Sequence, residues 1–227
     1  MGGIVPELAA PRASFLASGR KEQLEMSLPR PVNEKFSYSD YVTWPDDERW
    51  EIIDGVAYNM TPAPVVKHQT IVTNLIRELG DRPKEKGCRL LVAPTDVVFD
   101  EHNVVQPDVL VVCDRVKITE KNIRGAPDLV IEVLSPSTSV KDKREKKLLY
   151  ERFGVREYIL IHPEDELVER FFLEGSTYRA PDIFNWDESM EILTLAIELP
   201  LWEVFEKKRV QGERGSKEQN AAISEDH

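Results

Sequence analysis

Apolar and polar positions alternate in short blocks through the middle of the chain, and the period of each block indicates its secondary structure. Residues 50–53 and 56–60 have strand character and flank Asp54-Gly55, a dipeptide that favours a two-residue hairpin turn. Short, strongly apolar runs predict further strands at residues 88–99, 104–113, 129–134, 155–162 and 167–173, with a weaker one near 177.

Three segments show helical character instead. Residues 37–41 begin a short helix, and apolar residues recur at helical spacing through residues 68–79, where Gly80 ends the pattern. A further helix is expected at about 140–153, ending at Gly154. Because strands and helices are interspersed, their order predicts an α/β or mixed α+β fold with an N-terminal hairpin, a mixed sheet and a few helices.

Length and composition divide the chain into three parts. Its 227 residues, of which 41% are hydrophobic and 31% charged, are typical of one soluble folded domain, which we place at residues 36–205. Residues 1–35 lack sustained periodicity and are expected to form a disordered leader. Residues 206–227 are expected to form a disordered polar tail.

The sequence carries no signal for a membrane partner or for export. The longest apolar runs fall far short of the ~20 residues that a membrane span needs, and residues 1–25 contain no apolar stretch typical of a secretory signal. We therefore expect a cytoplasmic protein. For its two cysteines, Cys88 and Cys113, we expect buried reduced thiols rather than a disulfide.

Charge restricts the possible functions. The formal net charge is −11, and the excess of acidic residues falls within residues 36–205. An acidic domain is unsuited to coating nucleic acid through broad electrostatic attraction. It is compatible with an enzyme that holds a phosphodiester through metal ions, because those ions need carboxylate ligands.

Two carboxylates interrupt apolar runs. Glu132 lies within residues 129–134, a run apolar enough for a buried central strand, where a carboxylate is costly unless it is paired, hydrogen-bonded or bound to a metal. Asp108 follows Pro107 at the start of another apolar strand. Each has a structural interpretation when taken alone, as a buried ion pair for Glu132 and as a turn cap for Asp108.

The helix that follows Glu132 carries a third unusual position. Residues at intervals of three or four share one face of this helix, namely Asp142, Lys146, Leu149, Tyr150 and Phe153. A lysine on that face either meets carboxylates or a substrate phosphate, or extends along the rim of the core. Together with Asp108 and Glu132, Lys146 predicts a site for a hard cation such as Mg²⁺.

These motifs and several others occur in a recognisable order. They are Gln106-Pro107-Asp108, residues 125–138, 142–146, Tyr150 and 154–158, with residues 50–55, 61–64 and 68–69 upstream. In order and spacing they resemble the Uma-type restriction endonuclease family of the PD-(D/E)XK nuclease superfamily. The resemblance extends over about residues 36–205.

The resemblance implies a restriction-endonuclease-like core and metal-dependent hydrolysis of phosphodiester bonds. Asp108 then corresponds to the aspartate of the Pro-Asp half-motif and Glu132 to the acidic residue of the (D/E)XK half. With the backbone carbonyl of Val133 they would bind Mg²⁺, for which Mn²⁺ is a substitute. The third residue of that half-motif is Leu134 instead of lysine, and Lys146 is expected to replace it from the neighbouring helix.

Other polar residues have weaker claims to the site. Asp128 also follows a proline, but four residues along one strand would separate it from Glu132 by ~13 Å, too far to share an ion directly, so we interpret it as structural. His68 faces inward at the start of its helix, either as a core histidine or as a contact to a phosphate or a metal-bound water. Glu51 and Asp142 are expected to be supporting carboxylates.

The sequence therefore predicts a Mg²⁺-dependent endonuclease acting on nucleic acid, with DNA as the favoured substrate. A homodimer is the simplest way to cut both strands of a duplex. Two alternatives stay open. One is a catalytically silent nucleic-acid-binding or regulatory module on the same fold, which Leu134 and the acidic core favour. The other is an interaction protein in which a Glu132–Lys146 pair is purely structural.

Overall fold

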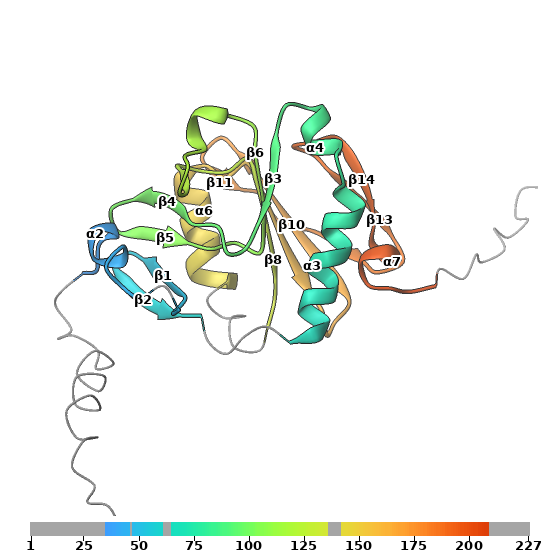
Figure 1. Ribbon diagram of the computed structural model, residues 1–227. Helices are drawn as coiled ribbons and strands as arrows, with labels where there is room; N and C mark the ends of the chain where they lie inside the picture. The colour runs from blue at the N-terminus through green and yellow to red at the C-terminus, as the bar shows by residue number, and fades with distance from the viewer. Residues whose placement is uncertain (1–34, 46, 61–64, 136–141, 209–227) are drawn as a thin grey trace, which may run out of the picture. The chain divides into compact units, whose positions relative to one another are not determined.

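The computed structural model describes residues 35–45, 47–60, 65–135 and 142–208, and it contains two sheets, a separate hairpin and several helices (Figure 1). The leader predicted at 1–35 and the tail predicted at 206–227 lie almost entirely outside the described residues. The same is true of residues 61–64 and of the start of the helix predicted at 140–153.

The larger sheet has the strand order β11-β10-β9-β8-β6-β3, with β12 paired to β10. Its strands are β3 (Arg89–Val92), β6 (Val109–Val112), β8 (Leu129–Val133), β9 (Glu157–His162), β10 (Leu167–Glu174), β11 (Thr177–Tyr178) and β12 (Asp182–Asn185). Strands β8 and β9 run parallel, whereas β8 and β6 run antiparallel. The predicted mixed sheet is confirmed.

The smaller sheet has the order β2-β1-β5-β4-β7. Its strands are β1 (Trp50–Ile53), β2 (Val56–Asn59), β4 (Val97–Asp100), β5 (Asn103–Val105) and β7 (Ile123–Arg124), and β13 (Ser189–Ile192) pairs with β14 (Ile197–Pro200) in a separate hairpin. The N-terminal hairpin β1–β2 forms as predicted. Asp54 and Gly55 both adopt positive φ, which a tight turn of this hand requires.

The strands predicted at 88–99 and 104–113 are wrong in extent, because each is two strands that belong to different sheets. The breaks fall around Pro94 and Pro107, which have no N–H to donate to a ladder. The chain thus passes from the larger sheet to the smaller one and back again. Asp108 lies at the return, directly before β6.

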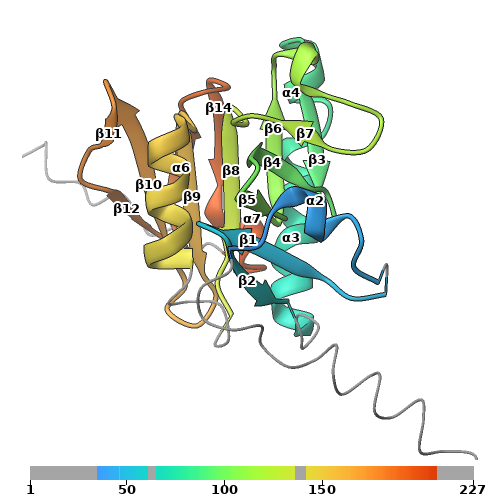
Figure 2. The same cartoon turned by 90° about the vertical axis from the view of Figure 1, so that its left-hand side faces the viewer.

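The α-helices of the described residues are α2 (Tyr38–Tyr41), α3 (Val66–Leu79), α4 (Arg82–Glu85), α6 (Lys147–Phe153) and α7 (Leu201–Val204), and a π-helical turn at Asp142–Lys146 leads into α6. Two of these helices, α3 and α6, cover opposite faces of the larger sheet (Figure 2). No described helix is long and apolar enough to span a membrane.

The two main hydrophobic clusters explain which side of the larger sheet each helix occupies. Ile131 of β8 packs in one cluster with residues of α3, while Val130 packs in the other with Tyr150 of α6 and with residues of the smaller sheet such as Ile53. Because side chains alternate along a strand, Glu132 points to the α6 side of the sheet, as Val130 does.

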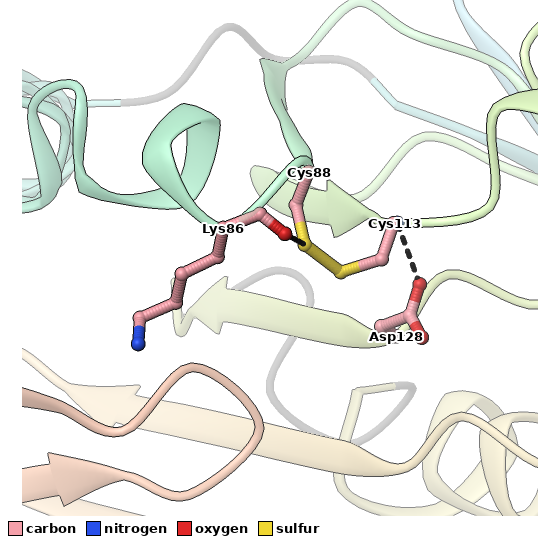
Figure 3. Close-up of a disulfide and its surroundings, with 4 residues drawn as sticks. All are labelled: Lys86, Cys88, Cys113 and Asp128. Carbon is pink, nitrogen blue, oxygen red and sulfur yellow. Dashed lines mark hydrogen bonds between the residues drawn. A yellow bond between two sulfur atoms is a disulfide. The ribbon is translucent and has the colours of Figure 1, made fainter.

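Cys88 and Cys113 form a disulfide, so the prediction of reduced thiols is wrong (Figure 3). The register pairs Arg89 of β3 with Val112 of β6, which places the two cysteines opposite each other one position further along the antiparallel pair, with their Cα atoms 3.9 Å apart. Composition and local apolar character do not report register, so the sequence could not reveal this pairing.

Candidate active site

Glu132 is a buried carboxylate held on both of its oxygens. The side chain is 3% exposed, in the apolar strand β8. Its Oε1 accepts hydrogen bonds from Lys146 Nζ at 2.8 Å and from the Tyr150 hydroxyl at 2.7 Å. Its Oε2 faces the backbone N–H of Asp108, with the nitrogen 3.4 Å away. The cost of burying this charge is therefore offset by directed donors.

Lys146 joins elements from both sheets through one buried ammonium. It is 1% exposed, and its Nζ lies 2.8 Å from Oε1 of both Glu132 and Glu51. Glu51 comes from β1 of the smaller sheet, is fully buried, and also accepts the backbone N–H of Gln106 at 3.0 Å. Lys146 thus points into the core toward Glu132, rather than along the rim.

Asp108 meets Glu132 from the neighbouring strand. The pairing of Val109 with Ile131 places Asp108 opposite Glu132 in the antiparallel register of β6 and β8. Asp108 Oδ2 accepts the backbone N–H of Val133 at 2.9 Å. Its side chain is 19% exposed, which makes Asp108 the carboxylate of the site that solvent reaches most readily.

His68 orients Asp108 from the first turn of α3. Its Nε2 lies 3.1 Å from Asp108 Oδ2, and its side chain is buried. Its Nδ1 has no hydrogen-bond partner among the described residues. The sequence left two interpretations of this histidine open, and the structure shows that its ring is tied to the carboxylate predicted as a metal ligand.

Tyr150 is a site residue that the sequence analysis did not assign. It is fully buried in α6, and burial raises the pKa of its hydroxyl well above the usual tyrosine value, with the nearby charge of Glu132 acting in the same direction. The hydroxyl therefore remains a proton donor to Glu132 at any physiological pH. Its position four residues after Lys146, on the same helix face, was the available signal.

The structure gives no polar role in this cluster to three other residues named from the sequence. Asp128 lies at the opposite end of β8, where its Oδ2 accepts the backbone N–H of Cys113 at 2.8 Å (Figure 3). Leu134 is buried in the hydrophobic cluster on the α6 side. The side chain of Asp142 lies outside the described residues.

The donor set suits a hard divalent cation. Among the described residues, no three side chains of His, Cys, Asp or Glu form a ready-made metal cluster. Mg²⁺, however, is commonly held by one or two carboxylates, with water and substrate phosphate completing its shell. Asp108 and Glu132 provide such a pair, and among the described side chains in contact here they and Glu51 outnumber the ammonium of Lys146. The residues present fit the ion.

Comparison with known proteins identifies the family. Residues 38–201 match Uma2, the family described as putative restriction endonuclease, so the chain belongs to this family and the resemblance drawn from its motifs is confirmed. No curated protein sequence matches the chain.

A crystal structure of similar fold is that of a putative nuclease belonging to DUF820 from Anabaena variabilis ATCC 29413. The TM-score is 0.64 at 21% sequence identity, and the match covers 75% of this chain and 98% of the other. At that identity the likeness shows the fold, and it confirms the predicted mixed α+β class. Family membership in turn supports a nuclease that acts on nucleic acid.

Proposed function

We propose that this protein is a Mg²⁺-dependent endonuclease that hydrolyses phosphodiester bonds, with DNA as its substrate. The observation that carries the proposal is that Asp108 lies opposite Glu132 in the strand register, with its backbone nitrogen 3.4 Å from Glu132 Oε2, beside the buried ammonium of Lys146. Such a group is costly to bury in an apolar core, so a functional reason for its presence is favoured over a structural one.

Asp108, Glu132 and the backbone carbonyl of Val133 would hold Mg²⁺, with Mn²⁺ as a substitute. The ion would supply charge neutralisation at the scissile phosphate and a bound water of lowered pKa. The N–H of Val133 donates to Asp108, and the N–H and C=O of one strand residue point to the same side of the strand. This supports Val133 as a source of a third oxygen.

The other polar side chains orient these groups. Lys146 would orient the attacking water or stabilise negative charge on the phosphoryl oxygens. Glu51 holds the amine of Lys146 from the smaller sheet, and His68 holds Asp108 from α3. Asp142 is retained as a supporting carboxylate from the turn that leads into α6.

Cleavage assays test this function directly. Plasmid DNA, together with DNA and RNA oligonucleotides, would be incubated with Mg²⁺, Mn²⁺ or EDTA. We expect the wild type to cleave DNA only with a metal ion, and Glu132→Gln to be inactive with an unchanged circular dichroism spectrum. Glu191→Gln, at an exposed glutamate of β13, is the matched control and should cleave like the wild type.

Three results would change the proposal. Cleavage by Glu132→Gln would remove Glu132 from the mechanism. Binding of nucleic acid without cleavage or metal dependence would favour the silent module that the sequence left open. Cleavage of RNA but not of DNA would show that RNA is the substrate instead of DNA.

We further propose a cytoplasmic homodimer, since two copies of the site suffice to cut both strands of a duplex. Light scattering at concentrations that support plasmid cleavage should give a dimer mass, and a monomer mass would contradict this.

The Cys88–Cys113 pair offers a check on the proposed cytoplasmic location, because cytosolic thiols are usually kept reduced. A persistent disulfide in protein taken from cells would argue for an oxidising compartment.

A further inference from the structure

We propose that Tyr150 is a positioning residue. Its hydroxyl, together with Lys146, fixes the rotation of the Glu132 carboxylate so that Oε2 stays directed at the backbone N–H of Asp108. This inference rests on the proposed function, because it concerns how the same site is held ready for its cation.

Two side-chain donors of described residues converge on the same oxygen of Glu132. The Tyr150 hydroxyl and Lys146 Nζ both donate to Oε1, at 2.7 and 2.8 Å. Oε2 is the oxygen that faces the backbone N–H of Asp108. The last torsion of a glutamate side chain is broad and roughly two-fold, so the rotamer alone does not select this orientation. Two donors that converge on one oxygen do select it.

The surroundings of Tyr150 keep its hydroxyl in place. The side chain is fully buried, and its ring packs against Tyr158 and Phe99 with centroids 5.1 and 6.0 Å away. The hydroxyl therefore cannot turn toward solvent without disrupting the core. By contrast, the hydroxyl of Tyr178 donates to the backbone carbonyl of Val155, which involves no charged group of the site.

Tyr150 and Lys146 make different contributions to Glu132. Lys146 brings a positive charge, which it shares with Glu51. The Tyr150 hydroxyl is neutral, so it restrains the carboxylate without cancelling the negative charge that attracts a cation. Residues that orient a metal ligand in this way typically change metal affinity or activity by about 10–100-fold when they are removed.

The experiment compares Tyr150→Phe with Tyr178→Phe, both of which remove one hydroxyl and its hydrogen bond. Mn²⁺ affinity would be measured by calorimetry, DNA cleavage would be resolved into kcat and KM, and the fold would be followed by thermal unfolding. For Tyr150→Phe we expect Mn²⁺ affinity and kcat to fall about 10–100-fold, with KM for DNA unchanged. For Tyr178→Phe we expect a lower Tm with wild-type Mn²⁺ affinity and kcat.

The outcomes separate this inference from the proposed function. Wild-type affinity and kcat in Tyr150→Phe, with metal binding lost in Glu132→Gln, would overturn the role of Tyr150 and leave the nuclease site intact. An equal loss in both tyrosine variants would also overturn it, since the effect would then be one of stability. Absence of Mn²⁺ binding in the wild type would contradict the proposed function, and the role of Tyr150 with it.

A second variant keeps the inference testable if Tyr150→Phe does not fold. Incorporation of p-aminophenylalanine at position 150 retains the ring and a weaker N–H donor toward Glu132. We expect a measurable loss of Mn²⁺ affinity that is smaller than tenfold. A loss of tenfold or more despite the retained donor would show that position 150 acts through packing instead of through the hydrogen bond to Glu132, and would overturn the proposal.

Discussion

Lys146 balances the buried charge of the site. Its ammonium lies between Glu51 and Glu132, and all three side chains are almost completely shielded from water. Desolvating these groups costs several kcal/mol per ion, which their mutual attraction and the added donors from Gln106 and Tyr150 offset. Removing the ammonium therefore takes away the cation that both carboxylates contact, whereas removing one carboxylate leaves Lys146 in contact with the other.

Replacement of Lys146 by Met should strongly destabilise the protein. The variant would remove the ammonium that both Glu51 and Glu132 contact in the core, and we expect the free energy of unfolding in urea to fall by about 3–5 kcal/mol. Lys147→Met is the matched control, because Lys147 is only partly buried and its amine lies over the ring of Phe171, 4.5 Å from the centroid. That variant should lose about 1 kcal/mol or less. Equal losses in the two variants would contradict this account of Lys146.

The residues that could be identified from the sequence are those that interrupt a hydrophobic pattern. Glu132 and Asp108 stand out in apolar strands, and Lys146 stands out on an apolar helix face. Tyr150 does not, because an aromatic residue on such a face is also what a plain core contact requires. The contact of Glu51 with Lys146 depends on how the smaller sheet packs on α6, which no local pattern reports.

Among the elements, Glu157 connects the β13–β14 hairpin to the larger sheet. It is buried at the start of β9, and its two carboxylate oxygens accept the backbone N–H groups of Leu193 and Thr194 at 3.0 and 2.7 Å. Burial raises the pKa of Glu157, an effect that outweighs these two hydrogen bonds, which act in the opposite direction.

This raised pKa gives a pH dependence of stability with a definite sign. The folded state binds the proton of Glu157 more tightly than the unfolded chain, so ionisation of this group opposes folding. Its contribution is fully present below the ordinary glutamate pKa of about 4.3 and is lost as the pH rises through the folded-state pKa. The stability difference between wild type and Glu157→Gln should therefore shrink with rising pH in urea titrations from pH 4 upward.

The control for this measurement is Glu191→Gln, an exposed glutamate on the same hairpin. Its stability curve should run parallel to that of the wild type. Parallel curves for wild type and Glu157→Gln would show that Glu157 does not titrate differently in the folded state, and would contradict the account.

The disulfide between the ends of β3 and β6 should contribute measurably to stability. It closes a loop with a sequence separation of 25, for which the loss of chain entropy in the unfolded state corresponds to about 3.5 kcal/mol. Reduction with dithiothreitol should lower the Tm by roughly 7–14 °C for a domain of this size. A Cys88→Ser/Cys113→Ser variant should be insensitive to the reductant, and two free thiols in the unreduced, denatured wild type would contradict the disulfide.

Among the individual elements, the sequence predicted correctly the helices and strands whose position is determined by hydrophobic periodicity and by turn residues. The β1–β2 hairpin and α3 form where they were expected. The exchange of strands between the two sheets around Pro94 and Pro107 was not predicted, because an apolar run does not say which sheet it joins. The short strands β12 to β14 were not predicted either, since four residues that alternate between apolar and polar are too few to distinguish a strand from a loop.

At the scale of the whole molecule, the site exists only when distant parts of the chain have come together. Glu51 comes from the smaller sheet, Asp108 and Glu132 from adjacent strands of the larger sheet, His68 from α3 and Lys146 from the turn before α6. The mixed fold class was predicted from the order of strands and helices, and the restriction-endonuclease-like core from the resemblance of the motifs to a known family. The contacts within the site were not, since they depend on packing between layers.

The measurement that tests the central claim most directly is calorimetric binding of Mg²⁺ and Mn²⁺ to the wild type, Asp108→Ala, Glu132→Gln and the control Glu191→Gln. We expect the wild type and the control to bind the ions, and the other two variants to lose binding, because their carboxylates would hold the ion between β6 and β8. Absence of binding by the wild type, even with a short oligonucleotide present, would contradict the account and favour the catalytically silent module.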